Sequence, residues 1–263
     1  MRRPGFVRRV SPDERLSIVD HLDELRRRIF VSIATLVAAF IGVYSVHGPV
    51  LRFLQRPLPS DQPLVTLAVS EAFFTVLKVS AYCAVIIAFP VLLYQFYAFI
   101  VPAVGDQSRR AMLMTVAGIS GLFLAGAAFG FFVVLPVALQ WLLGFADDVF
   151  VSQLRAGEYY GFATTFTLAS GLMFEVPVAM AGLAMMGIVP ATMYTRHWRV
   201  ALVVIAVVAA ALPGGDPVSM MLLMAPQVVL YALGVWLARI LGRDAPWRRG
   251  SDADRTDAGV PVV

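Results

Sequence analysis

Two carboxylates in this chain stand where a charge can do chemistry, and the first is Glu24. Arg27 and Arg28 follow it by three and four positions, a spacing that brings side chains together on a helix. One interpretation is a solvated, salt-bridged helix surface. The other is that Glu24 accepts a guanidinium from another molecule, because a carboxylate near a low-dielectric interface binds arginine in bidentate fashion and more strongly than in bulk water.

The second carboxylate, Glu175, lies near the midpoint of a long apolar segment. A charged acid at the centre of a membrane helix costs about 2.5–3.5 kcal/mol, so a residue there usually has a task. Three roles stay open: a structural hydrogen bond to hydroxyl groups of neighbouring helices, a contact for a partner helix with a polar residue, or a proton relay. Pro177 follows and should loosen the helix.

Residue patterns for catalysis or for holding a metal are missing from the sequence. The single cysteine, Cys83, cannot form an internal disulfide, and the histidines are scattered. The chain has no phosphate-binding loop, nucleophile elbow or H-E-x-x-H pattern. We therefore expect no enzyme, no cofactor and no metal site. The net charge of +4 is too small to predict a nucleic-acid partner.

The element that positions Glu24 is predicted to be an amphipathic helix running from near residue 12 into an apolar segment. Ser11-Pro12-Asp13-Glu14 is typical of a helix start, because serine caps, proline fits the first turn and glutamate follows three positions after the cap. Apolar residues then recur at helical spacing: Ile18, Leu22, Leu25 and Ile29.

Composition places these elements in a membrane. Of the 263 residues, 59% are apolar and 14% are charged, whereas soluble domains are about 45–50% apolar and about 25% charged. A membrane helix needs about 20 apolar residues. Six apolar segments predict an all-α polytopic integral membrane protein with six transmembrane helices: 29–46, 73–101, 111–137, 160–189, 200–212 and 218–241.

The fifth and sixth helices are predicted to be short. Thirteen residues in the fifth segment span about 20 Å, less than the bilayer core of about 30 Å. The turn Pro213-Gly214-Gly215-Asp216-Pro217 follows directly. We expect a short helical pair that thins the bilayer or is covered by a partner. The alternative is that the fifth span begins at Met193 or Arg196 and is nearly full length.

Arginine distribution predicts the orientation. Seventeen of the 20 arginines fall on one side of the predicted topology and three on the other, so both termini are expected in the cytoplasm. This divides the chain into a cytoplasmic amphipathic region (1–28), a six-span membrane domain (29–241) and a disordered cytoplasmic tail (242–263). The outer connections, about 47–72 and 138–159, are apolar enough to fold down as caps.

A set of motifs occurs in a fixed order between residues 16 and 242. They are His21-Leu22-Asp23-Glu24-Leu25-Arg26-Arg27-Arg28, Phe89-Pro90 with Tyr94-Gln95 and Ala98-Phe99, Pro102 with Arg109-Arg110, Phe131-Phe132-Val133-Val134-Leu135-Pro136, Gly171 with Phe174-Glu175-Val176-Pro177, and Pro213 with Asp216. In this order they resemble the TatC family, the multispanning core of the twin-arginine protein translocase.

The resemblance implies a receptor that binds signal peptides with paired arginines. With TatA- and TatB-type single-span partners, such proteins export folded proteins across the cell (inner, cytoplasmic) membrane, driven by the proton-motive force. It implies that Glu24 accepts arginine, that His21, Arg26 and Tyr94 surround it, and that Glu175 and Asp216 offer intramembrane partner contacts. Membrane lipid and further copies of the chain, as a homo-oligomer, are the other expected partners.

Two departures from the family pattern stand out. Ser108 occupies the place of a glutamate that supplies a second arginine-binding carboxylate in the family, and Asp106 is the nearest acid able to substitute. Leu212 and Met220 stand near places where the family often has a polar threonine and glutamine for docking single-span partners. Partner docking is therefore expected to be more apolar here.

Two other functions remain open on sequence grounds. A proton-coupled small-molecule transporter would use Glu175 as its protonatable site. A scaffold that only assembles other membrane subunits would copurify with partners without binding a signal peptide.

Overall fold

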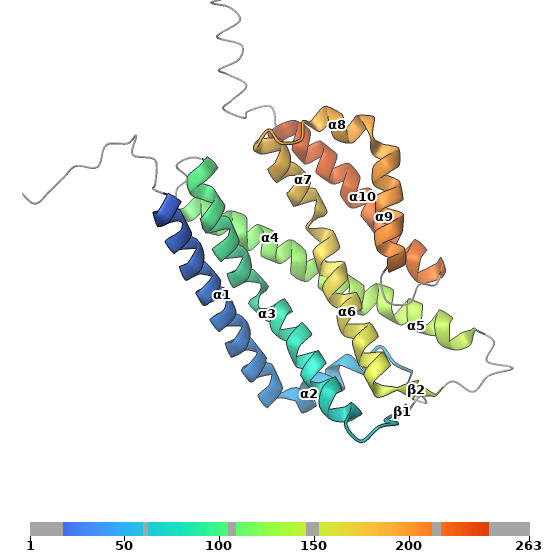
Figure 1. Cartoon of the computed structure of the whole chain (residues 1–263). Helices are drawn as coiled ribbons and strands as arrows, with labels where there is room; N and C mark the ends of the chain where they lie inside the picture. The colour runs from blue at the N-terminus through green and yellow to red at the C-terminus, as the bar shows by residue number, and fades with distance from the viewer. Residues whose placement is uncertain (1–17, 60–62, 105–108, 146–152, 212–216, 242–263) are drawn as a thin grey trace, which may run out of the picture.

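The computed structural model describes residues 18–59, 63–104, 109–145, 153–211 and 217–241, and nearly all of them are helical (Figure 1). In chain order the elements are α1 (Ile18–Ser45), α2 (His47–Leu54), β1 (Leu64–Val65), α3 (Glu71–Val104), α4 (Arg109–Phe129), the π-helical turn η1 (Gly130–Val134), α5 (Leu135–Gly144), β2 (Leu154–Arg155), α6 (Ala156–Phe174), α7 (Val176–Met185), α8 (Ala191–Arg196), α9 (Trp198–Ala211) and α10 (Pro217–Leu241). The predicted all-α membrane fold is confirmed.

Five helical stretches of the described chain are long and apolar enough to cross a bilayer. They are Leu22–Ser45, Glu71–Phe99, Met112–Gly144, Ala156–Met185 and Met220–Leu241. The sixth apolar helix, α9, has 14 residues and is short as predicted. The expectation that its successor is also short is wrong, because α10 has 25 residues. Pro217 starts that helix, and its internal Pro226 is accommodated without ending it.

Two of the long stretches change their helical geometry near a proline. The π-helical turn η1 ends just before Pro136, which lies in the first turn of α5. Proline lacks an N–H and clashes with the carbonyl four residues earlier, so the preceding turn widens. The break between α6 and α7 falls at Glu175, two residues before Pro177. The predicted loosening at Pro177 is therefore present.

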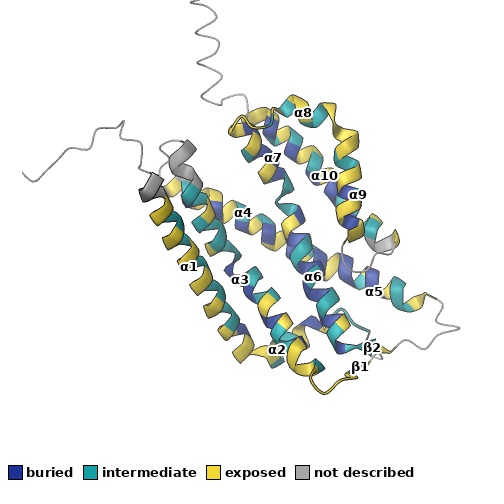
Figure 2. Cartoon of the chain, in the orientation of Figure 1, coloured by how far each residue is buried: buried dark blue, intermediate teal, exposed yellow. Residues whose placement is uncertain are grey.

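The helices lie side by side, with α1 at one edge and α9 and α10 toward the other (Figure 1). The core forms where α6 packs against α3 and α4. Phe123 and Phe166 are fully buried there, and the Phe89 ring stacks on Phe123 with centroids 3.7 Å apart. The outer surface of α1 is largely exposed (Figure 2), as expected for a helix facing lipid.

Three glycines allow α4 and α6 to approach closely. A Cβ on Gly126 would lie 2.5 Å from Cγ of Phe174, and a Cβ on Gly171 would lie 2.7 Å from Cε2 of Phe123. A Cβ on Gly130 would contact Ser170. Small residues at these positions bring helix backbones together, which is how helices pack where the surroundings are as apolar as their side chains.

The two connections predicted on the outer side are joined. The strands β1 and β2 pair in parallel, with Leu64 opposite Leu154 and Val65 opposite Arg155. The Tyr159 hydroxyl donates a hydrogen bond to the carbonyl of Leu54 at the end of α2, with 2.6 Å between the oxygens. These contacts hold α2 and the following loop against the start of α6.

Candidate functional site

Glu24 lies on α1 and is held by Arg28 one turn later. The Nε atom of Arg28 donates to Oε1 of Glu24 at 3.0 Å, and the Nη2 atom of Arg28 contacts the same oxygen. The Nη1 atom of Arg28 donates to Oε1 of Gln95 on α3 at 3.3 Å. The intrahelical pair expected from the sequence is therefore present, and Gln95 ties it to a second helix.

This pair leaves half of the Glu24 carboxylate available. Both Arg28 contacts use Oε1, and among the described residues Oε2 has no hydrogen-bond partner. An ionised carboxylate has two oxygens with about four acceptor positions. Glu24 remains 30% exposed in its side chain and Arg28 is 22% exposed. An incoming guanidinium can therefore bind Oε2 while Arg28 keeps Oε1.

A small cavity lies beside this group, between α1 and α3. Its volume is about 170 Å³, and Arg28, Gln95 and apolar side chains of both helices line it. Most of its wall is hydrocarbon, including Leu25, Leu92 and Phe96. The charged pair thus stands at the edge of an apolar space, where a charge-assisted hydrogen bond is stronger than in bulk water.

The other predicted residues of this site are distributed more widely. Arg26 is exposed, and its guanidinium carbon lies 5.7 Å from the centroid of the Phe30 ring, so it stays on its own helix. Tyr94 precedes Gln95 on α3 and is half-buried, with no described hydrogen bond to Glu24. His21 belongs to α1. Asp106, Ser108 and Asp216 lie outside the described residues, as does the predicted helix start at 11–14.

Glu175 occupies the break between α6 and α7. Its backbone N–H donates to the carbonyl of Leu172, and its carbonyl accepts from the N–H of Ala179. Its Oε1 atom is buried and has no hydrogen-bond partner among the described residues. Among the described residues, no hydroxyl group forms a hydrogen bond with this oxygen; the three roles predicted for Glu175 stay predictions. A buried acceptor without a partner is costly, so the position suits a group supplied from outside the chain.

A second charged group was not predicted as a site, and it lies at the opposite end of the molecule. The Glu71 carboxylate accepts from the backbone N–H of Leu67 at 2.9 Å and of Gly157 at 3.1 Å, and Arg155 contacts it at 3.2 Å. This carboxylate raises the pKa of the Arg155 guanidinium by hydrogen bonding and charge. The sequence signal was only an acid in the first turn of a helix, since its partners come from 84 and 86 residues away.

Comparison with known proteins identifies the family. Residues 20–226 match the sequence profile of the Sec-independent protein translocase protein (TatC) family. The chain belongs to the TatC family. Glu24, Tyr94, Glu175 and residues 212–216 all lie within the matched TatC region.

Relatives of the TatC chain are found in plants and bacteria. It is 39% identical over 234 residues to the chloroplastic Sec-independent protein translocase protein TATC of Arabidopsis thaliana, covering 88% of this chain and 68% of that protein. It is 33% identical over 231 residues to the Sec-independent protein translocase protein TatC of Carboxydothermus hydrogenoformans, covering 87% of this chain and 95% of that protein.

A solved structure has the same fold. The crystal structure of a twin-arginine translocase receptor, TatC, superimposes with a TM-score of 0.75 at 30% sequence identity. The match covers 84% of this chain and 99% of the crystallised chain. The helical arrangement described above is therefore the TatC fold.

Proposed function

We propose that this TatC chain is the signal-peptide receptor and membrane core of a twin-arginine translocase, which exports folded proteins using the proton-motive force. Its family membership and its fold support this role. The site we assign to the signal peptide is Glu24 with Arg28 and Gln95. It lies where the N-terminal part of α1 meets the C-terminal part of α3. We assign His21 and Arg26 of the same helix, Tyr94 next to Gln95 on α3, and Asp106 to the wider signal-peptide site around this group.

The observation that carries the proposal is the unequal use of the two Glu24 oxygens. Arg28 occupies Oε1 and Gln95 holds Arg28 from the neighbouring helix, so the carboxylate is oriented before any ligand arrives. Orienting a group in advance lowers the entropy cost of binding. The adjacent apolar cavity suits the hydrophobic stretch that follows the arginine pair of a signal peptide.

Replacement of Glu24 by glutamine tests the receptor role. Hydrogen bonds to charged groups contribute about 1.5–3 kcal/mol, so Glu24→Gln is expected to weaken binding of an arginine-pair signal peptide by about 10- to 100-fold. A lysine-pair peptide should bind weakly to both proteins, because an ammonium group lacks the planar fork of N–H donors that a guanidinium presents. Binding is measured by titrating purified protein with fluorescent peptide.

The neighbouring acid is the matched control. Asp23 lies on the same helix and is exposed, so Asp23→Asn removes the same charge from the same surface. It should leave the preference for the arginine pair unchanged. Equal affinity of Glu24→Gln and the original protein for the arginine-pair peptide would overturn the assignment.

We propose that the intramembrane carboxylate serves the partner subunits. The buried, unpartnered Oε1 of Glu175 suits a polar side chain on a TatA- or TatB-type single-span helix, and Asp216 marks a second contact near the α9–α10 turn. Glu175→Leu is expected to reduce copurification of the single-span partner, whereas Glu158→Leu, at an exposed glutamate, should not. Normal copurification of Glu175→Leu, together with loss of export, would favour a proton relay instead.

The same proposal assigns the location of the chain. We infer a multi-pass protein of the inner (cytoplasmic) membrane with both termini in the cytoplasm, in contact with membrane lipid and with further copies of itself. The start of α1 and the end of α10 lie at the same end of the molecule (Figure 1), which supports an even number of crossings. The arginine distribution supports the direction.

A further inference from the structure

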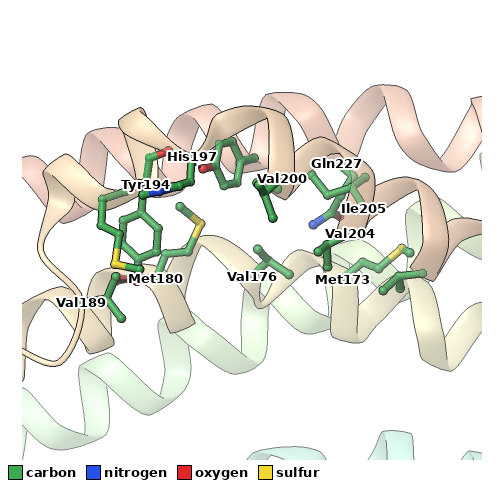
Figure 3. Close-up of a pocket in the computed structure, with 14 residues that line it drawn as sticks. Met173, Val176, Met180, Val189, Tyr194, His197, Val200, Val204, Ile205 and Gln227 are labelled. Atoms are coloured by element: carbon green, nitrogen blue, oxygen red, sulfur yellow. Dashed lines mark hydrogen bonds between the residues drawn. The ribbon is translucent and has the colours of Figure 1, made fainter.

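A second, larger cavity lies away from Glu24, where α9 stands off from α7 and α10 (Figure 3). Its volume is about 370 Å³. The side of α9 that faces it presents Val200, Val204 and Val208, and the opposite wall presents Met173, Val176 and Met180. The cavity therefore runs along the greater part of α9, and its walls are mainly branched apolar and methionine side chains.

The wall chemistry of this cavity favours a flexible hydrocarbon chain. Methionine is unbranched and fills irregular apolar space adaptably. One polar side chain, Gln227 of α10, lines the cavity and is 3% exposed; the remaining polar groups gather at the end near α8.

The α8 end of the cavity is basic. His197 lines it, Arg196 ends α8, and Arg199 follows one residue into α9. Between residues 176 and 215 the sequence contains no acidic residue, so these charges have no carboxylate neighbour on their own stretch of chain. Trp198 is exposed between them, as aromatic residues commonly are at the membrane interface.

Two tyrosines hold α8 over this end of the cavity. The Tyr194 hydroxyl donates to the carbonyl of Met180 on α7 at 3.2 Å, and the Tyr231 hydroxyl of α10 donates to the carbonyl of Tyr194 at 2.8 Å. His197 is thus fixed at the mouth of an apolar space. Arg196 and Arg199 do not line the cavity but adjoin its lining residues His197 and Val200 in the chain, and the Arg199 guanidinium carbon lies 5.6 Å from the centroid of the Trp198 ring. Basic pockets between membrane helices at the cytoplasmic surface bind anionic lipid head groups.

We propose that this cavity binds one anionic phospholipid, with an acyl chain lying along Val200, Val204 and Val208 and the phosphate at Arg196, His197 and Arg199. The hydrocarbon wall accounts for the acyl chain. The basic residues beside the mouth, on a stretch from 176 to 215 that contains no acid, account for the choice of an anionic head group. The site shares no residue with the Glu24 group, so it does not rest on the signal-peptide assignment.

Native mass spectrometry of the purified, delipidated protein in detergent tests the proposal, with phosphatidylglycerol and phosphatidylcholine of identical acyl chains added in equal amounts. The original protein is expected to retain one phosphatidylglycerol in preference to phosphatidylcholine. Val204→Trp fills the cavity and should abolish this retention. Val203→Trp is the matched control, because Val203 is the adjacent residue of α9, is exposed and does not line the cavity, and it should retain the lipid.

The contribution of the lipid head group is tested separately from that of the acyl chain. Joint replacement Arg196→Gln and Arg199→Gln changes exposed residues and leaves the packing intact, so it remains informative if the tryptophan variant does not fold. It should reduce the preference for phosphatidylglycerol by about 30-fold, since each of the two basic residues contributes about 1 kcal/mol. Inorganic phosphate should not displace the lipid, because it has no chain to occupy the cavity.

Three results would overturn the proposal. They are equal retention of both lipids by the original protein, full retention by a folded Val204→Trp variant, and displacement by inorganic phosphate. The Gln227→Leu variant tests whether the cavity binds a polar partner helix rather than a lipid. It should leave lipid retention unchanged, whereas loss of lipid together with loss of a copurifying single-span protein would assign the cavity to a polar partner helix instead.

Discussion

The Glu24 side chain forms one of the two arrangements that the sequence presented as alternatives and remains compatible with the other. Arg28 forms the intrahelical pair, as i and i+4 residues of opposite charge do, yet it uses only one carboxylate oxygen. Gln95 then orients Arg28 from α3. A salt-bridged surface and an arginine acceptor are therefore compatible at this residue, because a carboxylate accepts more hydrogen bonds than one arginine needs here.

The tyrosines at the start of α6 provide a test of how the outer connection is held. The Tyr159 hydroxyl is buried and bonds to the Leu54 carbonyl at 2.6 Å, whereas the Tyr160 hydroxyl reaches the Leu51 carbonyl at 3.4 Å. Tyr159→Phe is expected to destabilise the protein by about 1 kcal/mol. Tyr160→Phe should cost clearly less, because its hydrogen bond is longer. Thermal unfolding in detergent compares them, and equal losses would contradict the assignment.

Among the helices, the crossing of α4 and α6 depends most on small residues. Gly126 and Gly130 form a Gly-xxx-Gly pattern of the kind common in membrane spans, and the structure shows what each glycine faces. Gly126 lies against the Phe174 ring, and Gly130 lies against Ser170. Gly118 and Gly121, on the same helix, face open space. The same residue type thus has different importance at positions less than three turns apart.

Substitution by alanine distinguishes glycines that contact a neighbouring helix from glycines that face open space. Gly126→Ala is expected to destabilise the protein by about 1–3 kcal/mol, because the new Cβ would overlap the Phe174 ring. Gly118→Ala should be neutral or stabilising by up to about 1 kcal/mol, since alanine favours the helix and meets no neighbour. Unfolding measurements on the two single variants provide the comparison. Equal stability of both variants would show that α4 and α6 accommodate the added Cβ without a loss in the free energy of unfolding.

The two ends of the molecule differ in how accessible their residues are. At the end that carries the start of α1, a charged pair and a basic junction at α8 remain accessible, whereas at the opposite end β1, β2 and Glu71 tie the connections together (Figure 1). The asymmetry agrees with a receptor surface at one end and a closed cap at the other. It also gives the orientation a direct test.

Labelling of single cysteines is expected to place the two ends on opposite sides of the membrane. In a Cys83→Ala background, Thr192→Cys on α8 should react with an impermeant maleimide only in inverted membrane vesicles. Val69→Cys, at a fully exposed position before α3, should react in intact spheroplasts. Labelling of both from the same side would contradict the proposed topology.

The amino-acid sequence alone was enough to establish a helical membrane protein, the approximate spans, the short α9 and the family motifs. The length of an apolar segment and the order of motifs can be read from the sequence itself, so they do not depend on how the helices pack. The sequence also identified Glu24 and Glu175, since a carboxylate in apolar surroundings is conspicuous without coordinates. The bounds of α10 were also predicted closely, as 218–241 against the observed Pro217–Leu241, but the helix was wrongly expected to be short because it was grouped with α9 as a short pair joined by a tight turn.

Contacts between distant residues required the folded chain. Gln95 meets Arg28 across 67 positions, Glu71 meets Arg155 across 84, and the cavity beside α9 exists only because residues of α6, α7, α8, α9 and α10 line it together. None of these residues carries a periodicity or motif that would pair it with its partner. Side-chain spacing along one helix follows from the sequence, whereas the spacing between helices follows from how glycines, prolines and aromatic rings allow them to pack.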